Sequence, residues 1–599
     1  MTPANTAKYF LDVETSLSGQ SWMERLSSSE KNTALAISQR FDLPELVGRV
    51  MAARGVDLEA AASFLSPTLR ELMPDPSVLT DMQQATARIS QAIAATENVA
   101  IFGDYDVDGA CSSALMYKFL AHHGLNPKIH IPDRIFEGYG PNIPAIEQLA
   151  QDGATLIITV DCGATSFEAL ARAKELGVDT VVLDHHQMGT ELPECVALVN
   201  PNRQDDLSGL GHLCAAGVVF LTLVSVLRSL REKNTYSDTL PPPDLLQWLD
   251  LAALATVCDV VPLLGVNRAF VVTGLQIMAK QQNMGLKALM RAGRLDGAPK
   301  PYHLGFVLGP RINAGGRIGD AALGSRLLTT QDSDTAKDIA EQLNALNEER
   351  QKAEAVMLEE AVSEAEREHR DGTGPSVIVT ASQEWHPGIV GLLASRLKER
   401  FRRPAFAVAF DRHGTGSGSG RSISGVDLGA VVRAAVEEGI LVKGGGHAMA
   451  AGLTVKKDRF GDFRAFLEEN LAKNVAQVSA SQRIKIDGAL TARSVTLELI
   501  DMLEKAGPFG QSHPQPIFAF PAHQIRYPKI VGKDHVSFTA CASDGAQLRA
   551  IAFRAAETPM GNAILNAQGS GLHLVGTLNA DFWQGTRRVQ LRVLDAAKA

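Results

Sequence analysis

The sequence predicts an α/β protein of several domains: a parallel-sheet domain, a long connecting helix, a smaller α/β domain and a small C-terminal β-barrel. Three observations support this prediction. Strand-like and helical patterns alternate from Asn98 to Asn200, a helical pattern free of glycine and proline runs from Ser333 to His369, and strand-like segments follow Ile484. The length of 599 residues exceeds a single core and suggests roughly three or four domains.

Composition and charge narrow the possible classes of protein. The chain is 45% hydrophobic and 21% charged, which is typical of globular proteins, and no run of apolar residues is long enough to predict a membrane span. Residues 1–20 lack a secretory signal pattern, and the six cysteines are scattered without a C-x-x-C pair, so we expect a reducing, cytoplasmic location. With a net charge of −9, nucleic-acid binding would need local basic strips or metal ions.

Residues 1–90 are predicted to be a helical N-terminal leader. Leu43–Leu65 and Asp81–Ala94 carry apolar residues at helical spacing. No candidate chemistry is found in this segment, and we expect it to pack on the domain that follows.

Acidic residues follow the first predicted strand, Val99–Phe102. Asp104, Asp106 and Asp108 alternate along the chain after Gly103, and a helical pattern begins at Gly109. Carboxylates crowded at the end of a strand repel one another unless cations lie between them, so the segment suggests a divalent-metal site.

Two other structures could contain such an acidic segment. A calcium-binding EF-hand loop would need a glutamate at its twelfth position, which is Leu115, so that motif is excluded. Taken alone, the segment is equally compatible with an acidic surface turn.

Two further predicted strands end in the same kind of residue. Leu156–Val160 leads into Asp161, and Asp179–Leu183 leads into Asp184, His185 and His186. Because helices separate these strands, they should pair in parallel and bring their carboxyl ends to one edge of the sheet, where α/β proteins bind ligands. This convergence favours a metal site over a surface turn.

Asp259 is a further candidate ligand. It follows an apolar helical segment, Leu245–Val257, and precedes Pro262. By itself it is typical of a residue at a helix end. Together with the three strand ends it becomes a candidate member of the site.

The candidate ligands together predict a metal of the Mn²⁺ or Mg²⁺ class, because carboxylates with one or two imidazoles suit these ions better than zinc. So many acids exceed the need of one ion, and we expect two ions with a shared carboxylate that activate water for phosphoester hydrolysis. The candidates are Asp104, Asp106, Asp108, Asp161, His185, His186 and Asp259.

Three glycine-rich segments are predicted to be loops. Residues 309–317 carry Arg311 and Arg317, residues 416–422 carry Arg421, and residues 444–447 end at His447 before a predicted helix. Glycines let backbone amides approach phosphate, and arginine adds a charge-assisted bond, so these side chains are candidates to hold phosphates. Flexible turns are an equally valid interpretation of the glycines alone.

The C-terminal segment interleaves basic and aromatic residues in a predicted small barrel. Its expected strands are residues 537–542, 548–553, 572–578 and 588–594. Such a strip suits single-stranded nucleic acid, although charged outer faces of a purely structural barrel would have the same pattern. The residues are Arg549, Arg554, Phe582, Trp583, Arg587, Arg588 and Arg592.

The ordered motifs resemble the DHH phosphoesterase superfamily, and within it the single-stranded-DNA-specific exonucleases. The motifs are Asp-Tyr-Asp-Val-Asp-Gly, Val-Asp-Cys-Gly, Leu-Asp-His-His, Val-Cys-Asp-Val-Val-Pro-Leu and Gly-Gly-Gly-His. Gly-Pro-Arg-Ile-Asn-Ala-Gly-Gly-Arg-Ile-Gly, Trp-His-Pro-Gly and Ser-Gly-Arg-Ser also match in order. The resemblance covers about residues 40–599.

The resemblance implies a domain for each segment: a helical leader (1–90), a DHH catalytic domain (91–325), a connecting helix (326–372), a DHH-associated substrate-binding domain (373–475) and an OB-like nucleic-acid-binding domain (476–599). It implies 5′→3′ hydrolysis of single-stranded DNA to 5′-mononucleotides with Mn²⁺ or Mg²⁺, in DNA repair and recombination. Ligation falls to Asp106, Asp108, Asp161, His185 and Asp259, with Asp104 and His186 in support.

The resemblance also implies substrate contacts and partners. Ser419, Arg421 and His447 would line a phosphate pocket, and Trp583 with Arg587 would contact DNA from the barrel. We expect a monomer that works with single-stranded-DNA-binding protein and a RecQ-type helicase, and no membrane association. Val107 replaces a usual alanine, and Phe102 occupies the place of a histidine ligand in some superfamily members.

Two competing functions remain at this stage. A nanoRNase or cyclic-dinucleotide phosphodiesterase of the same superfamily would be shorter and would lack the barrel. A binding protein without catalysis would have lost some of the candidate ligands, whereas Asp108, Asp161 and His185 are all present.

Overall fold

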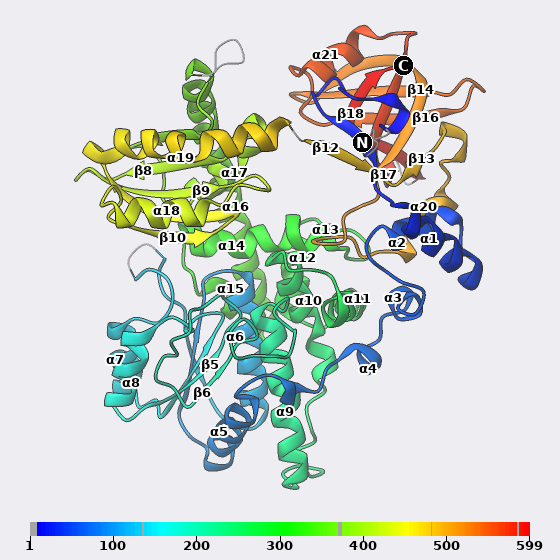
Figure 1. Cartoon of the computed structure of the whole chain (residues 1–599). Coiled ribbons are helices and arrows are strands. Elements are labelled where there is room, and N and C mark those ends of the chain that lie inside the picture. Colours follow the sequence, from blue (N-terminus) through cyan, green and yellow to red (C-terminus); the bar gives the residue numbers. More distant parts are fainter. Residues whose placement is uncertain (1–8, 135–136, 369–373, 481, 584–585) are drawn as a thin grey trace, which may run out of the picture. The chain divides into compact units, whose positions relative to one another are not determined.

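The computed structural model describes residues 9–134, 137–368, 374–480, 482–583 and 586–599 (Figure 1). The chain divides into two compact units, which are treated separately below. One contains Met1–Met73, Pro262–Ala269 and Gln482–Ala599, and the other contains Pro74–Val261 and Phe270–Ser481.

A parallel five-stranded sheet forms the first half of the larger unit, in the order β3-β2-β4-β5-β6. Every residue of β2 and β4 is buried, which explains their continuous apolar sequences. The prediction of parallel strands with helical crossovers is confirmed. The strands are β2 (Val99–Gly103), β3 (Lys128–His130), β4 (Leu156–Val160), β5 (Asp179–Leu183) and β6 (Ala197–Val199).

Helices cover both faces of this sheet. Phe102 and Ile157 share a buried cluster with α7 (Ile143–Gln151) and α8 (Phe167–Glu175). The opposite face contacts α6 (Val107–His122) and α9 (Ala215–Glu232), and α5 (Met82–Ala95) packs beside α9. Next along the chain come η3 (Leu245–Trp248), α10 (Leu249–Cys258), α11 (Gly265–Ala279), α12 (Met284–Ala292), α13 (Pro301–His303), η4 (Leu304–Leu308), α14 (Gly309–Ile318) and α15 (Leu323–Thr329).

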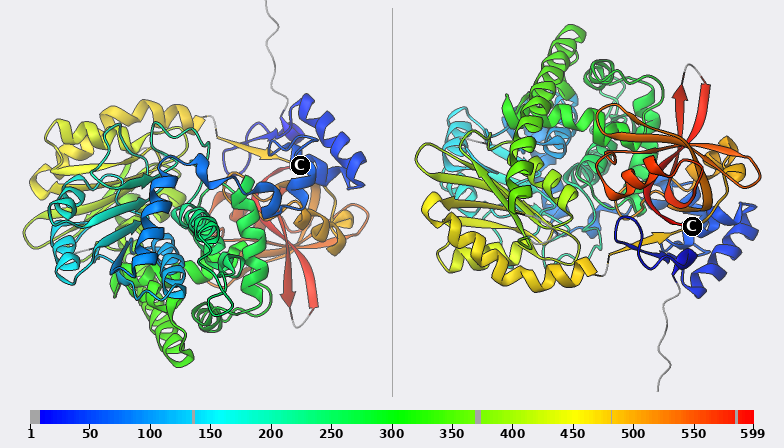
Figure 2. Two further views of the ribbon diagram at one scale, coloured as in Figure 1. Left: turned by 90° about the horizontal axis from the view of Figure 1, so that it is seen from below. Right: turned by 90° about the horizontal axis from the view of Figure 1, so that it is seen from above.

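The predicted connecting helix is confirmed as α16 (Ser333–Glu368), a single helix of 36 residues that Figure 2 shows as one long rod.

A second sheet follows in the order β10-β11-β9-β8-β7, with only the β7–β8 pair parallel. Its elements are β7 (Ile378–Ser382), α17 (Val390–Phe401), β8 (Ala405–Phe410), β9 (Thr415–Arg421), α18 (Leu428–Glu437), β10 (Lys443–His447), β11 (Ala450–Lys456) and α19 (Phe460–Ala480).

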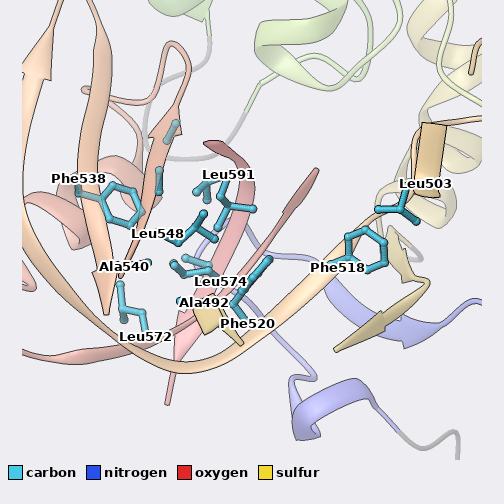
Figure 3. Packing of buried hydrophobic residues seen from close by; sticks show 14 of the residues in the cluster. Ala492, Leu503, Phe518, Phe520, Phe538, Ala540, Leu548, Leu572, Leu574 and Leu591 are labelled. Carbon is cyan, nitrogen blue, oxygen red and sulfur yellow. The ribbon is translucent and has the colours of Figure 1, made fainter. Parts of the chain in front are cut away.

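A closed barrel dominates the smaller unit. Ladders join β14–β15–β16–β18–β17 in turn, and β17 pairs back with β14. Phe520, Phe538, Leu574 and Leu591 fill its interior, as Figure 3 shows. The elements are β12 (Arg483–Ile486), β13 (Gly488–Ala489), α20 (Leu497–Lys505), β14 (Phe518–Val531), β15 (His535–Cys541), β16 (Gln547–Ala552), α21 (Pro559–Asn566), β17 (Gly571–Trp583) and β18 (Thr586–Lys598).

The expectation that the N-terminal leader packs on the domain after it is wrong for the residues up to Met73. Strand β1 (Ser21–Glu24) pairs in parallel with β12, and Val47 and Met51 of α2 (Glu45–Ala52) belong to the barrel cluster. α1 (Ser28–Phe41), α3 (Ala61–Leu65) and α4 (Leu69–Leu72) complete this segment. No local pattern predicts this pairing, because it joins strands separated by most of the chain.

The three glycine-rich segments are not loops. Residues 309–317 lie in α14, 416–421 lie in β9, and 444–447 lie in β10, which turns into β11 and not into a helix. The glycines serve close packing: a Cβ on Gly316 would come within 2.6 Å of the Tyr105 carbonyl oxygen, and one on Gly420 within 2.3 Å of the Phe406 ring. α14 therefore lies directly against the acidic turn that follows β2.

Candidate metal and phosphate site

The acidic turn after β2 begins α6 in a way that fixes two carboxylates. Asp106 is the N-cap of α6, and its Oδ1 accepts hydrogen bonds from the backbone N–H of Asp108 at 2.8 Å and of Gly109 at 3.1 Å. Asp108 is 1% exposed and accepts from the first two amides of α9, those of Ala215 at 2.6 Å and Ala216 at 2.8 Å. The positive end of the α9 dipole thus holds a carboxylate at the site.

His185, at the end of β5, presents one bare nitrogen to three carboxylates. Its Nδ1 donates to the Leu213 carbonyl oxygen at 3.1 Å, which leaves Nε2 without a proton in the neutral ring. Nε2 lies 3.3 Å from Asp161 Oδ1 and 3.7 Å from both Asp108 Oδ2 and Asp259 Oδ2. A lone pair facing three carboxylates is unfavourable unless a cation or proton lies between them.

Asp184 orients the second histidine. Its Oδ1 accepts hydrogen bonds from the backbone N–H groups of His185 and His186 and, at 2.8 Å, from Nδ1 of His186. Its other oxygen accepts from the Ala164 amide at 2.9 Å. The hydroxyl of Tyr139 lies 3.3 Å from Nε2 of His186 and donates to the Asp161 carbonyl oxygen at 3.2 Å.

The electrostatics of the cluster fit divalent cations. Burial, followed by repulsion from neighbouring carboxylates, raises the pKa values of Asp104 and Asp161 well above the ordinary value of an aspartate. The same causes raise the pKa of Asp259 to about 9. Oδ1 of Asp104 and Oδ1 of Asp161 are buried with no hydrogen-bond partner among the described residues. Unpaired buried carboxylate oxygens beside a bare imidazole nitrogen form a donor set suited to Mn²⁺ or Mg²⁺.

The Asp184–His186 pair shows the opposite behaviour. Burial acts to raise the pKa of Asp184, but the hydrogen bond and charge of His186 hold it at about 2. The same carboxylate, against the effect of burial, raises the pKa of His186 to about 9. These two groups therefore form an ion pair at neutral pH.

All seven candidate ligands come together in the structure. Their ligand atoms form three overlapping groups, each within 4.8 Å: Asp161, His185 and His186; Asp108, His185 and Asp259; Asp104, Asp106 and Asp161. Asp161 and His185 each belong to two of the groups. The arrangement has room for more than one ion with shared ligands.

A cluster of arginines lies beside the acids. The Arg134 guanidinium lies over the Tyr105 ring at 5.1 Å, and Arg317 donates to the Gly388 carbonyl oxygen at 3.1 Å. Burial, then repulsion from Arg134, Arg350 and Arg421, lowers the pKa of Arg317 to about 10. Mutual repulsion among buried guanidiniums is relieved by an anion, and phosphate suits this role.

Ser419 and Arg421 of β9 belong to the same region. Nη1 of Arg421 donates to the Ser419 hydroxyl oxygen and to the Gly420 carbonyl oxygen, both at 2.8 Å. Burial, then the charge of Arg134, lowers the pKa of Arg421. Both residues face the first turn of α17, since a Cβ on Gly391 would lie 3.0 Å from the Arg421 guanidinium and 3.2 Å from the Ser419 hydroxyl.

The remaining predicted contact residues are Arg311, His447, Trp583 and Arg587. Arg311 donates to Asn344 Oδ1 at 3.0 Å and to the Val307 carbonyl oxygen at 2.7 Å, so it faces α16. His447 ends β10 with an exposed side chain, and no described contact joins it to the acids. Arg587 pairs with Asp501 at 2.6 Å, and the side chain of Trp583 lies outside the described residues.

Sequence reasoning missed Arg134, Tyr139 and the orienting role of Asp184. Arg134 and Tyr139 lie in the segment after β3, a strand that was not predicted because it has only three residues, Lys128–His130. Recognition of β3 as a further parallel strand would have placed the end of that strand at the same edge of the sheet as the acids.

Comparisons with known proteins identify relatives of this chain. Three family models match: the DHH family N-terminal domain over residues 98–256, the DHHA1 domain over 374–473 and the RecJ OB domain over 486–595. The single-stranded-DNA-specific exonuclease RecJ of Dickeya dadantii is 36% identical over 92% of this chain and 96% of its own length. RecJ of Bacillus subtilis is 33% identical over 95% of this chain and 70% of its own length.

A solved RecJ structure also resembles this chain in fold. The crystal structure of Thermus thermophilus RecJ in complex with Mn²⁺ matches with a TM-score of 0.78 and 27% identity, over 95% of this chain and 78% of that one. None of the helices within the described ranges has the length and hydrophobicity needed to cross a membrane. From its three domains and these relatives, the chain belongs to the RecJ family of single-stranded-DNA-specific exonucleases.

Proposed function

We propose that this protein is a metal-dependent exonuclease that degrades single-stranded DNA in the 5′→3′ direction, releases 5′-mononucleotides and acts in DNA repair and recombination. One observation carries the proposal: a cluster of carboxylates and a cluster of mutually repelling arginines lie in the same unit, and Tyr105 contacts the arginine cluster from within the acidic turn. The first cluster suits metal ions and the second suits a terminal phosphate.

The metal site would be formed by Asp106, Asp108, Asp161, His185 and Asp259, with Asp104 and His186 in support. Two Mn²⁺ or Mg²⁺ ions bound there would supply an activated water and charge stabilisation for phosphodiester hydrolysis. Relatives crystallised with Mn²⁺ and Mg²⁺ support this choice of ions.

The side chains of the chain itself orient these groups. The amides at the start of α9 hold Asp108, and the Leu213 carbonyl fixes the His185 tautomer so that Nε2 faces the acids. The hydrogen bond from Nδ1 of His186 to Asp184 orients the His186 ring beside Asp161, where Nδ1 lies 3.9 Å from Oδ1 of Asp161.

Arg134, Arg317, Ser419 and Arg421 would bind the 5′-terminal phosphate. This assignment gives a physical reason for polarity, since a strand whose 5′-phosphate lies in this pocket places its first phosphodiester bond beside the acids. Arg311, His447, Trp583 and Arg587 would make further contacts with the DNA.

We retain the remaining expectations as proposals. The five-domain division at residues 90, 325, 372 and 475, the monomeric state, and the partnership with single-stranded-DNA-binding protein and a RecQ-type helicase follow from the family. The free thiols at Cys111, Cys162, Cys195, Cys214, Cys258 and Cys541 support a reducing cytoplasm.

The deciding experiment is digestion of 5′- and 3′-labelled single strands and duplexes, with and without Mn²⁺. The proposal expects a labelled mononucleotide as the first product from the 5′ end, slow loss of the 3′ label, intact duplex and no reaction after chelation. Release from the 3′ end first would contradict the assigned polarity. Efficient cleavage of dinucleotides without cleavage of long strands would favour a nanoRNase-type enzyme.

A further inference from the structure

Two aromatic side chains are exposed on the helical segment that leads to the phosphate cluster. Tyr302 is 57% exposed and Phe306 is 71% exposed, and their rings stack with centroids 5.0 Å apart and planes 22° apart. Two exposed rings in contact form an apolar surface on which a further ring can stack. Their outer faces are open to a flat partner.

The pair lies on an unusual turn of helix. η4, Leu304–Leu308, is a π-helix that joins α13 to α14, so residues 301–318 form one continuous helical segment. π-helical turns are rare and are often found at functional sites. The Leu304 carbonyl oxygen of this turn accepts a hydrogen bond from the Cys258 thiol at 3.3 Å, one residue before Asp259.

The same helical segment carries the rings and Arg317 of the phosphate cluster. Tyr302 and Phe306 lie four residues apart, and Asn313 and Arg317 lie four residues apart in α14, beyond the π-helical turn. Oδ1 of Asn313 is buried without a hydrogen-bond partner among the described residues. Phe306 precedes Arg317 by 11 residues, which is ~16 Å of helix at ~1.5 Å per residue, and Tyr302 precedes Arg317 by ~22 Å.

The chain segment before the rings exposes three cations and, between them, the acid Asp296. A Cβ on Gly293 would lie 2.8 Å from Val307, so the end of α12 packs against η4. Arg291 and Arg294, on either side of Gly293, are exposed, as is Lys300 at the start of α13. Exposed rings flanked by cations are the usual platform for single-stranded nucleic acid.

Given the exonuclease activity proposed above, we propose that Tyr302 and Phe306 form a base-stacking surface for the substrate strand a few nucleotides from its 5′ end. A strand stacked as in a duplex advances ~3.4 Å per nucleotide, and a stretched strand advances further, so the rings meet a base within about the first six nucleotides. The surface binds strands long enough to reach it and contributes nothing to shorter ones.

The test compares substrate lengths in the full-length protein with Mn²⁺. For Tyr302→Ala with Phe306→Ala, KM for a 5′-phosphorylated 20-mer should rise about 5- to 150-fold, the range reported for loss of one stacked base. KM for a 5′-phosphorylated dinucleotide should change less than twofold. The variant that combines Tyr302→Ala with Phe306→Trp should keep most of the wild-type affinity for the 20-mer, because tryptophan also stacks.

An abasic scan locates the contact. Single abasic sites at positions two to eight of the 20-mer should weaken wild-type binding at one or two positions and leave the double variant unaffected there. Val356→Ala, on the exposed face of α16 and 60% exposed, is the matched control and should behave as wild type with every substrate.

The outcomes separate this proposal from the proposed function. An equal rise of KM for dinucleotide and 20-mer, or no rise for either, would overturn the stacking surface. Rescue by Phe306→Leu as fully as by Phe306→Trp would also reject stacking in favour of simple apolar contact. Absence of any wild-type cleavage of single strands would instead refute the exonuclease itself.

Discussion

Oδ1 of Asp184 accepts hydrogen bonds from two backbone amides and from Nδ1 of His186, and it does so from a fully buried position between β5 and the site. Asp184 is not in any of the three groups of candidate ligands, but it sets the orientation of the His186 ring, which belongs to one of them. Replacement by asparagine would remove the charge that holds the imidazole and leave the backbone bonds partly in place.

We therefore expect Asp184→Asn to lower Mn²⁺ affinity or kcat by about 10- to 100-fold, the usual cost of losing a partner behind a metal ligand. Metal titration followed by calorimetry, with exonuclease rates at saturating Mn²⁺, measures both. The matched control is Asp179→Asn, at the solvent-exposed start of the same strand. Wild-type metal affinity and turnover in Asp184→Asn would show that the ion pair is only structural.

Asp161→Asn should abolish hydrolysis and leave DNA binding mostly intact. Asp161 has a φ of 61°, a left-handed conformation that asparagine tolerates far better than alanine, so this variant keeps the fold while removing the charge shared by two ligand groups. Fluorescence anisotropy with a labelled 20-mer and turnover assays provide the two readouts. Turnover within tenfold of wild type would remove Asp161 from the mechanism.

Arg134→Gln should make the enzyme indifferent to the 5′-phosphate. A charge-assisted bond to phosphate is worth about 1.5–3 kcal/mol, so KM for a 5′-phosphorylated strand should rise about 10- to 150-fold and that for a 5′-hydroxyl strand should hardly change. The control is Arg172→Gln. Arg172 lies on α8 and pairs with Glu147 of α7 and with Glu175 of α8. Equal increases for both strand types would place Arg134 elsewhere along the DNA.

The sequence was sufficient to predict the strands that carry the acids. β4 and β5 were predicted with their observed bounds, because each is a short apolar run that ends at a polar residue. The convergence of Asp104, Asp161 and His185 then followed from parallel pairing alone. β14 was missed because Pro521 and Pro528 interrupt it and two bulges shift its register.

The glycine-rich segments show what a single sequence does not contain. Gly416, Gly418 and Gly420 look like a flexible loop, but each lies opposite a large side chain of β8, where a Cβ would come within 3.0 Å of Phe410, Val408 or Phe406. That cause is the register of a neighbouring strand, which no local pattern reports. The hydrogen bonds of Asp184 were hidden for the same reason, since its Ala164 partner lies in another connection.

Trp22→Phe should destabilise the barrel unit by about 2–4 kcal/mol. Nε1 of Trp22 donates to Asp595 Oδ2 at 2.9 Å, and both residues are fully buried, so phenylalanine leaves an unpaired carboxylate oxygen and a small cavity. Urea unfolding monitored by hydrogen exchange in β18 measures the change. Trp385→Phe, whose indole bonds to the exposed Glu360, should cost clearly less in its own unit, and equal costs would mean that burial of the acceptor is irrelevant.

His513 should make the barrel unit sensitive to acid well above the range of its carboxylates. The ring is fully buried, its Nε2 donates to the Ala506 carbonyl oxygen at 2.7 Å, and its Nδ1 has no partner among the described residues. Burial, opposed by the Ala506 hydrogen bond and reinforced by Arg268 and Arg54, lowers the pKa of His513 to about 3. The unfolded chain, with an ordinary pKa of about 6.5, therefore takes up a proton that the folded state does not.

This difference in pKa makes the free energy of unfolding fall as the pH is lowered. Stability is fully present above pH 6.5 and is lost as the pH falls from there toward 3, at up to about 1.4 kcal/mol per pH unit, which gives about 2 kcal/mol between pH 7.5 and 5.0. His513→Gln keeps a donor for Ala506 and cannot titrate, so urea unfolding of the variant should lack this part of the slope. Parallel pH dependences in the two proteins would show that the folded His513 accepts its proton as readily as the unfolded chain does.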